Sequence, residues 1–348
     1  MKRIAVIGAG ISGLTAAWVL GRRHQVVLFE AEARIGGHTC TVPVMDPLGP
    51  LQVDVGFIVF NDRTYPNFNK LLGQLGVGQQ PTNMGFAVSS ETTGLEYSGD
   101  GLGGLFAQKR NLLSPSHWRM IAEILRFNRE APSLLDSAAG ELPLGEYLRQ
   151  GGYSQHFCDH YILPMGSAIW SCSEAQMKAF PARFFVRFFD NHGLLTISNR
   201  PQWYVVPGGS SRYVERLLAG LKAEVRAATP VFQVRRAEQG VSVSSPAGTE
   251  IFDDVVFACH SDQALALLAD ADMDEQQLLG NIPYQDNDVV LHTDTSLLPA
   301  SRRCWSSWNA LLPRDKGDRV QVTYNMNILQ GLRAEQTWCV TLNASDRI

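Results

Sequence analysis

Apolar positions near the start of the chain predict a strand, a helix and a second strand. Residues 2–7 contain the unbroken apolar run IAVI, which is typical of a strand in a parallel sheet that is covered on both faces. Apolar residues then recur at helical spacing from Leu14 to Leu20, and Gly21 supplies a stop signal for the helix. Residues 26–29 form a second apolar run. This order predicts a β–α–β unit.

A glycine motif lies between the first strand and the helix. Residues 8–13 read GAGISG and match G-x-G-x-x-G. In such a motif Gly8 permits a tight turn, Gly10 lets a pyrophosphate approach the backbone, and Gly13 lets the helix pack closely on the strand. The helix N-terminus, at Ile11 and Ser12, offers free N–H groups and a partial positive charge. These features predict a dinucleotide site.

An acidic residue completes the nucleotide motif. Glu30 ends the second strand, seventeen residues after Gly13. A carboxylate at that place, followed here by Ala31, accepts hydrogen bonds from ribose hydroxyls and repels a 2′-phosphate. NADP is therefore disfavoured at this site.

The rest of the chain alternates between helical and strand patterns. Helical stripes cover 68–76, 116–128 and 144–151, and residues 84–98 predict two strands around a turn at 92–94. The region 180–189 is rich in phenylalanine, and the spacing of its rings predicts one helix face. That face is interpreted as core packing, with the lining of an acyl-chain pocket or a membrane-facing lip as the alternative. The rings are Phe180, Phe184, Phe185, Phe188 and Phe189.

Composition narrows the classes of function. The length of 348 residues suggests about two domains. Charged residues make up 18% and the net charge is −4, so there is no basic excess to neutralise a nucleic acid. No apolar stretch reaches the 18 residues of a membrane span, and the apolar run at 4–7 is too short for a signal peptide.

The cysteines indicate a reducing compartment and no metal site. None of the six forms a C-x-x-C pair or lies at zinc-ligand spacing with histidines, although Cys158 stands between His156 and His160. Scattered reduced thiols fit a cytoplasmic protein.

A second motif distinguishes FAD from NAD as the cofactor. The stretch RIGGHTCT at 34–41 resembles the R-x-G-G-R-x-x-[ST] motif that follows the dinucleotide fold in FAD-dependent amine oxidases and their relatives. The resemblance implies FAD contacts from Arg34, Gly36, Gly37 and Thr39. His38 departs from the family's arginine, and a histidine carries a full charge less reliably near neutral pH.

The resemblance extends along most of the chain. Residues 54–57 resemble the family's D-x-G segment near the flavin, which implies contacts from Gly56 and Phe57. The turn PGG at 207–209 resembles the one that leads into a helix. Residues 231–234 resemble the strand whose valine, here Val231, contacts the adenine. Residues 253–258 resemble the strand that returns to the nucleotide domain and ends at Ala258.

This resemblance implies an α/β architecture, a Rossmann-like FAD-binding domain with an inserted α+β substrate domain. The expected division is 1–60 and 201–265 for FAD binding, 61–200 for the insertion, and 266–348 for the sheet of the substrate domain. The family's C-terminal FAD-binding segment has no match here, so an inactive truncated fragment is one expectation for this chain.

A narrower resemblance bears on the substrate. The motif around His38, with FND at 60–62 and YPN at 65–67, looks like a bacterial subgroup of these flavoproteins. Members of that subgroup are often encoded beside, or fused to, cyclopropane-fatty-acid synthases. This implies a small-molecule or lipid-like substrate only by association, with peripheral membrane contact as one option.

The expected activity is that of an FAD-dependent oxidoreductase that moves a hydride from a substrate C–H bond to flavin N5, as amine oxidases and desaturases do. No lysine maps to the one that amine oxidases often place near N5, since only Lys222 and Lys316 follow residue 178. The alternatives are an NAD-dependent Rossmann dehydrogenase and a flavin-binding protein without turnover.

Other candidate residues carry weaker signals. His292 and Asp294 are candidate polar groups in a predicted strand, although a surface strand explains them more simply. His260 follows the returning strand and is interpreted as a structural residue. Four tryptophans are candidate walls of a site near the flavin, Trp170, Trp203, Trp305 and Trp308.

Overall fold

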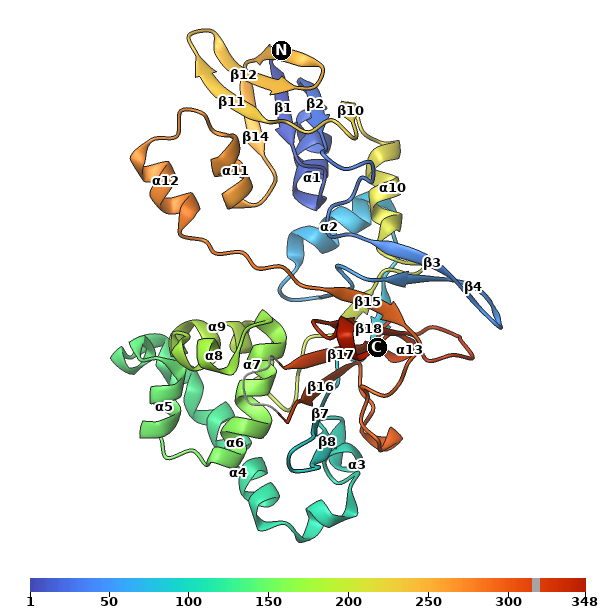
Figure 1. The fold of residues 1–348 in the computed structure, drawn as a ribbon, viewed down its shortest axis with the longest axis vertical. Helices are drawn as coiled ribbons and strands as arrows, with labels where there is room; N and C mark the ends of the chain where they lie inside the picture. The colour runs from blue at the N-terminus through green and yellow to red at the C-terminus, as the bar shows by residue number, and fades with distance from the viewer. Residues whose placement is uncertain (315–319) are drawn as a thin grey trace.

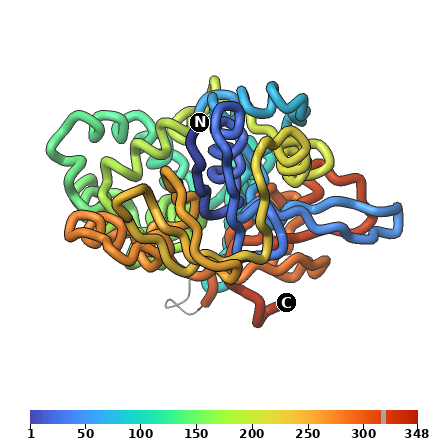
Figure 2. The backbone as a smooth tube through the Cα atoms, turned by 90° about the horizontal axis from the view of Figure 1, so that it is seen from above, coloured from blue at the N-terminus to red at the C-terminus, as the bar shows by residue number. Residues whose placement is uncertain are grey.

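The computed structural model describes residues 1–314 and 320–348 (Figure 1). The molecule is elongated, with the N-terminal strands at one end and a group of helices beside a mixed sheet at the other. Viewed from above, those helices lie to one side of the N-terminal strands, and the β3–β4 ribbon, built from Thr41–Asp46 and Gly49–Asp54, projects to the other side (Figure 2).

A four-stranded parallel sheet forms the N-terminal end, in the order β10-β2-β1-β14. Its register aligns Ile7 with Phe29 and with Phe257, so the carboxyl ends of three strands meet at one edge. The predicted strand at 2–7 and the predicted returning strand at 253–258 are both confirmed. The four strands are β1 Arg3–Ile7, β2 Gln25–Phe29, β10 Glu224–Arg226 and β14 Asp254–Phe257.

Both faces of this sheet are covered, which explains the unbroken apolar runs in its sequence. Side chains alternate along a strand, so Val6 packs into one core and its neighbour Ala5 into another. The first core lies under three helices, α1 Ile11–Leu20, α2 Pro66–Leu75 and α10 Ser211–Ala219. The second lies under an antiparallel sheet of β11 Gln233–Ala237, β12 Gly240–Ser245 and β13 Gly248–Phe252.

A six-stranded mixed sheet forms the other half, in the order β15-β18-β17-β16-β7-β8. It brings together residues far apart in sequence, because β7 pairs in parallel with β16. The predicted strand pair at 84–98 is confirmed as β7 and β8. The strands are β7 Phe86–Ser90, β8 Glu96–Ser98, β15 Val289–His292, β16 Trp308–Leu312, β17 Gln321–Asn325 and β18 Cys339–Leu342.

Helices pack beside this sheet around a core rich in aromatic rings, to which Phe127, Phe157 and Phe185 contribute. The predicted helices at 116–128 and 144–151 are confirmed. The larger helices of this layer are α4 Pro115–Glu130, α5 Leu144–Gln150, α7 Leu163–Trp170 and α9 Ala182–Asn191. The shorter ones are α3 Gly101–Leu105, α6 Gln155–Phe157 and α8 Glu174–Ala179, with a π-helical turn at Cys158–Ile162.

The prediction that the five phenylalanines share one helix face is wrong. Phe180 precedes α9, which begins at Ala182. Phe185 and Phe189, four residues apart, are fully buried, whereas Phe184 is 57% exposed on another side of the helix. Core packing explains Phe185 and Phe189 fully, and Phe180 and Phe188 pack against the same core while partly buried.

A small three-stranded sheet lies between the two halves, formed by β5 Val59–Asn61, β9 Trp203–Val205 and β6 Gln80–Thr82. The central strand β9 pairs with both neighbours, so the chain returns from the helices beside the segment through which it left. After β14 come α11 Ser261–Leu267 and α12 Met273–Gly280, at the N-terminal end of the molecule. The Rossmann-like α/β fold class is confirmed, while the residue boundaries of the domains stay a prediction.

Candidate active site

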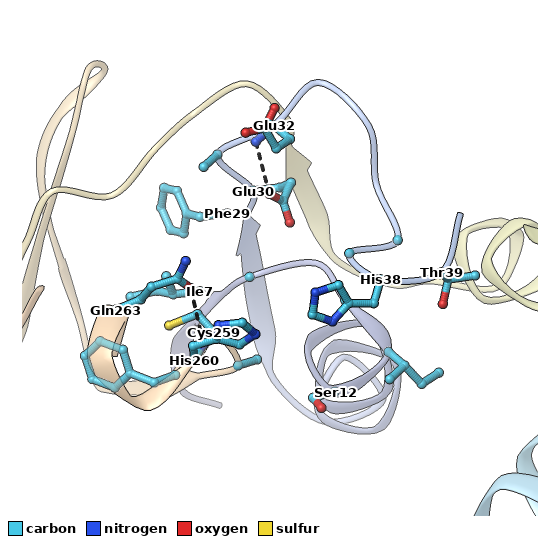
Figure 3. Close-up of a pocket in the computed structure, with 18 of the residues that line it drawn as sticks. Ile7, Ser12, Phe29, Glu30, Glu32, His38, Thr39, Cys259, His260 and Gln263 are labelled. Atoms are coloured by element: carbon cyan, nitrogen blue, oxygen red, sulfur yellow. Dashed lines mark hydrogen bonds between the residues drawn. The ribbon is translucent and has the colours of Figure 1, made fainter. Parts of the chain in front are cut away.

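A cavity of about 1200 Å³ opens at the carboxyl ends of β1, β2 and β14 (Figure 3). Open α/β sheets bind ligands at this edge. The volume exceeds the 300–1000 Å³ usual for small-molecule pockets, so there is room for a dinucleotide. We call it the nucleotide cavity.

Glycines shape the floor of the nucleotide cavity. Gly8 has a φ of +100°, and a Cβ there would lie 2.7 Å from the carbonyl oxygen of Ala258. A Cβ on Gly13 would lie 1.8 Å from the oxygen of Gly8. In contrast, a Cβ on Gly10 would meet nothing nearer than the Cα of Gly37, at 3.9 Å. Gly8 and Gly13 are therefore required by packing within the protein, whereas Gly10 leaves space that a ligand can use.

The N-terminus of α1 faces the same cavity. Its first backbone bond runs from the N–H of Leu14 to the carbonyl oxygen of Gly10, and no side chain caps the helix. The amides of Ile11, Ser12 and Gly13 lie ahead of that bond. The helix therefore presents donors and a partial positive charge where phosphates would bind.

Glu30 lies at the end of β2 and lines the cavity. Its Oε2 accepts a hydrogen bond from the N–H of Ala9 at 2.7 Å, and its Oε1 accepts one from the N–H of Glu32 at 3.0 Å. Each carboxylate oxygen has a second lone pair. Glu30 thus both fixes the β1–α1 turn and retains acceptors suited to ribose hydroxyls.

The loop that carries the second glycine motif closes on itself. Arg34 donates to the carbonyl oxygens of Thr39 and Gly37, each at 2.7 Å, and the Thr39 hydroxyl is hydrogen-bonded to the hydroxyl of Tyr213. Gly36 forms an isolated parallel β-bridge with Gly10, and this backbone pairing joins the two glycine motifs. Arg34 therefore holds the loop in shape as well as lining the cavity.

The structure brings most of the predicted FAD-binding residues together. The cavity is lined by Gly8, Gly10, Ile11, Ser12, Glu30, Ala31, Arg34, Gly36, Gly37, His38, Thr39, Phe57, Val231 and Ala258. Gly13 and Gly56 lie outside the lining, and each permits a close backbone approach instead. A Cβ on Gly56 would lie 1.8 Å from the carbonyl oxygen of His38. The predicted strand at 231–234 begins at Gln233, so Val231 lies in the loop before β11.

The interpretation of His260 as a structural residue agrees with its place in the fold, because it caps the N-terminus of α11 and its backbone N–H donates to the Gln263 side chain at 3.3 Å. His260 lines the nucleotide cavity, and its ring lies 5.6 Å from that of His38 (Figure 3). It stacks on Tyr284, with centroids 4.3 Å apart. Its neighbour Cys259 also lines the cavity, and burial raises the pKa of that thiol. Their place directly after β14 was the sequence signal that could have found them.

A second cavity of about 510 Å³ lies between the small central sheet and the helices. Tyr65 lines both cavities, and burial raises the pKa of its phenol. The wall is largely apolar and draws on distant segments, among them Met84, Phe86, Met165, Ile169, Phe188, Trp203 and Trp308. We call it the apolar cavity.

Two of the four candidate tryptophans line the apolar cavity. Trp203 and Trp308 line it, as does Phe188. Trp170 instead packs against Phe180, Phe185 and Phe188, and Trp305 donates its indole N–H to the carbonyl oxygen of Pro299 at 2.7 Å.

The remaining candidate residues lie outside both cavities. The Nε2 of His292 is hydrogen-bonded to the Thr341 hydroxyl at 2.7 Å, and burial lowers the pKa of this imidazole. Asp294 accepts hydrogen bonds from Ser296. Lys222 lines neither cavity, and Lys316 lies outside the described residues. His292 and Asp294 are thus positioned to stabilise their own sheet and loop.

The described residues contain neither a metal-binding cluster nor a helix fit to span a membrane. Within 1–314 and 320–348 no cluster of three histidine, cysteine, aspartate or glutamate side chains could hold a metal ion. No helix in this part of the chain has the length and apolar character that crossing a membrane requires.

Comparison with known proteins decides the family. The sequence model described as flavin containing amine oxidoreductase matches residues 11–317. The chain belongs to this family. Membership confirms the resemblance found in the glycine motifs and the predicted cofactor, FAD, and it argues against an NAD-only dehydrogenase.

Individual members of the flavin amine oxidoreductase family are more distant. The chain is 27% identical over 259 residues to a protein named as flavin-containing monoamine oxidase AofH of Mycobacterium tuberculosis. The aligned region covers 70% of this chain and 54% of that protein. It is 46% identical over 56 residues to an L-amino-acid oxidase of Sistrurus catenatus edwardsii. This shorter aligned region covers 15% of this chain and 11% of that protein. The chain thus spans about half or less of the length of these curated relatives.

A solved structure supports the same fold. Cyclohexylamine oxidase from Brevibacterium oxydans superimposes with a TM-score of 0.67 over 98% of this chain and 74% of its own, at 18% identity.

The residues of the nucleotide cavity fit FAD. The space above Gly10, the helix amides at its edge and the carboxylate of Glu30 match the pyrophosphate and ribose of a dinucleotide. Val231 would contact the adenine of the cofactor. The aromatic residues Phe57, Tyr65 and Phe68 line a further part of the cavity wall.

Proposed function

We propose that this chain is an FAD-dependent oxidoreductase whose substrate binds in the apolar cavity. The observation that carries the proposal is the shared wall: Tyr65 lines both the nucleotide cavity and the apolar cavity. A cofactor site and a second, apolar site that meet at one side chain are the arrangement that a transfer between cofactor and substrate requires.

When bound, FAD supplies a hydride acceptor at N5 of its ring system. The protein's own residues bind, orient and exclude water. Phe188, Trp203 and Trp308 surround the substrate with apolar surface, which removes competing water from a reacting C–H bond. Tyr65 lies between the two sites, and its ring is tilted by 65° against that of Trp203 at a centroid distance of 6.5 Å.

One histidine in the apolar cavity is placed to accept a proton. The Nδ1 of His192 is 2.8 Å from the carbonyl oxygen of Phe188 in its own helix turn, so Nδ1 carries the hydrogen. The ring stacks between Phe188 at 4.0 Å and Trp203 at 6.2 Å, which fixes its plane. Nε2, on the opposite side of the ring, is left as the acceptor for a proton lost by the substrate.

The substrate class that we propose is lipid-like. The wall of the apolar cavity is suited to hydrocarbon, and the subgroup resemblance adds to this by association. Since the residues that line this cavity include no lysine, the water-bridged lysine of amine oxidases has no equivalent among them.

The test is the flavin content of the purified chain, followed by anaerobic reduction. We expect a yellow protein that is bleached by an apolar substrate and not by water-soluble diamines. A colourless protein that binds NAD would overturn the cofactor assignment. Tightly held FAD that no amine, acyl or polyene compound reduces would favour a flavin-binding protein without turnover.

A further inference from the structure

The charges around the apolar cavity are one-sided. Among its lining residues, all of which lie in the described part of the chain, there is no aspartate and no glutamate. The charged side chain among these lining residues is that of Arg200. A ligand that enters this cavity therefore meets positive charge and hydrocarbon but no carboxylate.

Arg200 is held at the mouth of the cavity by the fold of its own loop. Gly193 adopts a φ of +67°, and a Cβ there would lie 2.3 Å from the Cδ of Pro201, so the segment 193–201 folds back on itself. The Nε of Arg200 donates to the carbonyl oxygen of Thr196 at 2.8 Å. This bond uses one of five N–H donors and orients the guanidinium.

The charge of Arg200 has no partner of opposite sign within the described residues. The ion pairs of this part of the chain engage many other arginines, but not Arg200. The side chain is exposed, so it lies at the entrance rather than in the depth of the cavity. Four N–H donors of a planar guanidinium are left for a ligand.

The depth of the cavity differs from its mouth. Met84, Met165 and Ile169 contribute flexible apolar surface, and Phe86, Phe188 and Trp308 contribute rings. Such a wall gains free energy from burying a hydrocarbon and loses free energy when it desolvates an unpaired charge.

A cationic substrate fits this arrangement less well. Aromatic rings attract an ammonium group, but here the ammonium would lie near Arg200 with no carboxylate to balance it. A carboxylate at the mouth instead forms two parallel hydrogen bonds with a guanidinium.

We propose that the apolar cavity takes a hydrocarbon substrate that ends in a carboxylate, with Arg200 as the residue that binds the carboxylate. This rests on the proposed function in one respect, that the apolar cavity is the substrate site. It makes the substrate an apolar acid rather than an amine.

The experiment uses three probes with the same chain length. Dodecanoate and dodecylamine, each far below its micelle concentration, and dodecanol, below its solubility limit, are titrated into the FAD-loaded full chain at pH 8, and binding is followed by calorimetry and by the flavin absorbance. We expect one site, with dodecanoate bound at least tenfold more tightly than dodecylamine.

The variants of Arg200 change the charge or the hydrogen-bonding geometry of this one side chain. Arg200→Gln should weaken dodecanoate at least tenfold and leave dodecanol unchanged, Arg200→Lys should keep part of the affinity, and Arg200→Glu should reverse the preference toward dodecylamine. Arg187→Gln is the matched control, because Arg187 is exposed on α9 and lies outside the cavity. Flavin content and melting temperature report whether each variant folds.

Equal affinity for the acid and the amine would overturn the inference, as would an Arg200→Gln variant that binds dodecanoate normally. Binding of several dodecanoate molecules without saturation would overturn it too. These outcomes are measured without turnover, so they are distinct from failure of the proposed function, which would appear as missing FAD or as a flavin that no substrate reduces.

Discussion

The two cavities differ in what builds their walls. Backbone and glycines shape the nucleotide cavity, mostly within residues 7–39, with β14 and the residues after it as the opposite wall. Side chains shape the apolar cavity, and they come from segments as far apart as Val59 and Trp308. A substitution in the first should therefore act by removing space for a ligand, and a substitution in the second by changing the properties of a surface.

The largest effect is expected at Gly10. Gly10→Leu should abolish FAD retention, because the side chain would occupy the space that the structure leaves open for the pyrophosphate. The fold should persist, since a Cβ at this place meets nothing within 3.4 Å. The ratio of flavin to protein absorbance and the melting temperature measure the two effects separately.

Gly73→Ala is the control for Gly10, because a Cβ on this α2 residue meets nothing within 4 Å. It should keep its FAD. Normal flavin content in Gly10→Leu would show that the pyrophosphate binds elsewhere.

The adjacent residues Phe188 and Phe189 have different surroundings, since Phe188 lines the apolar cavity and Phe189 lies in the buried core. Phe189 is fully buried, so Phe189→Ala should lower the free energy of unfolding by about 3–5 kcal/mol. Phe188 is only partly buried and lines the apolar cavity, so Phe188→Ala should cost less stability and weaken the binding of apolar ligands. Chemical denaturation and ligand titration of both variants test the division. Equal stability losses with equal ligand affinity would contradict it.

An intermediate effect is expected at Glu30. Glu30→Ala should weaken FAD binding by about 1–3 kcal/mol, because charged hydrogen bonds to the ribose are lost. Glu30→Gln keeps one acceptor oxygen and should lose less. Equilibrium titration of the apoprotein with FAD gives both values, and Glu238→Ala, an exposed carboxylate outside the lining of the cavity, is the control. An unchanged dissociation constant for Glu30→Ala would contradict the prediction that Glu30 accepts hydrogen bonds from the ribose of FAD.

The smallest effect is expected from pH and concerns the helices behind the apolar cavity. Burial lowers the pKa of His117, His156 and His160, and the neighbouring imidazoles lower that of His156 further. An unfolded histidine titrates near pH 6.5, so below that pH the unfolded chain binds more protons than the folded one. Stability should thus be complete above about pH 6.5 and decline as pH falls through the lowered values.

Melting temperatures between pH 8 and pH 5 measure this decline. His160→Gln removes one of the three titrating groups and should flatten the curve, whereas His24→Gln, at a half-buried site in the N-terminal half and away from these helices, is the control. A curve of the same slope in both variants would assign the acid sensitivity to other groups.

The nucleotide site was predictable because its constraints are local. Gly8 and Gly13 are each required by a close backbone approach within a few residues or from one adjacent strand, and Gly10 leaves space for a ligand. Such constraints appear directly as glycines in the sequence. Gly13 has the close packing of helix on strand that was predicted for it, whereas Gly56, expected to contact the flavin, permits a close backbone approach beside the site.

The apolar site was not predictable in the same way. A ring such as Phe188 or Trp203 reads in sequence like any core residue, and only the return of β9 beside β5 brings these rings together. The phenylalanine-rich stretch showed the same difficulty, because the start of α9 at Ala182 decides which rings face inward. Arg200 carried no sequence signal, since an arginine in a loop is usually a solvated side chain.

The position of β14 in the parallel sheet sets the order in which the cofactor site forms during synthesis. The glycine motifs leave the ribosome early, but β1 acquires its partner β14, and the nucleotide cavity its far wall of Ala258 to Leu267, only after more than two hundred further residues. At bacterial or eukaryotic elongation rates that delay is on the order of ten seconds or more. Throughout that delay one edge of β1 has no partner strand, so the nucleotide cavity cannot be completed around FAD until β14 and the residues after it have been made.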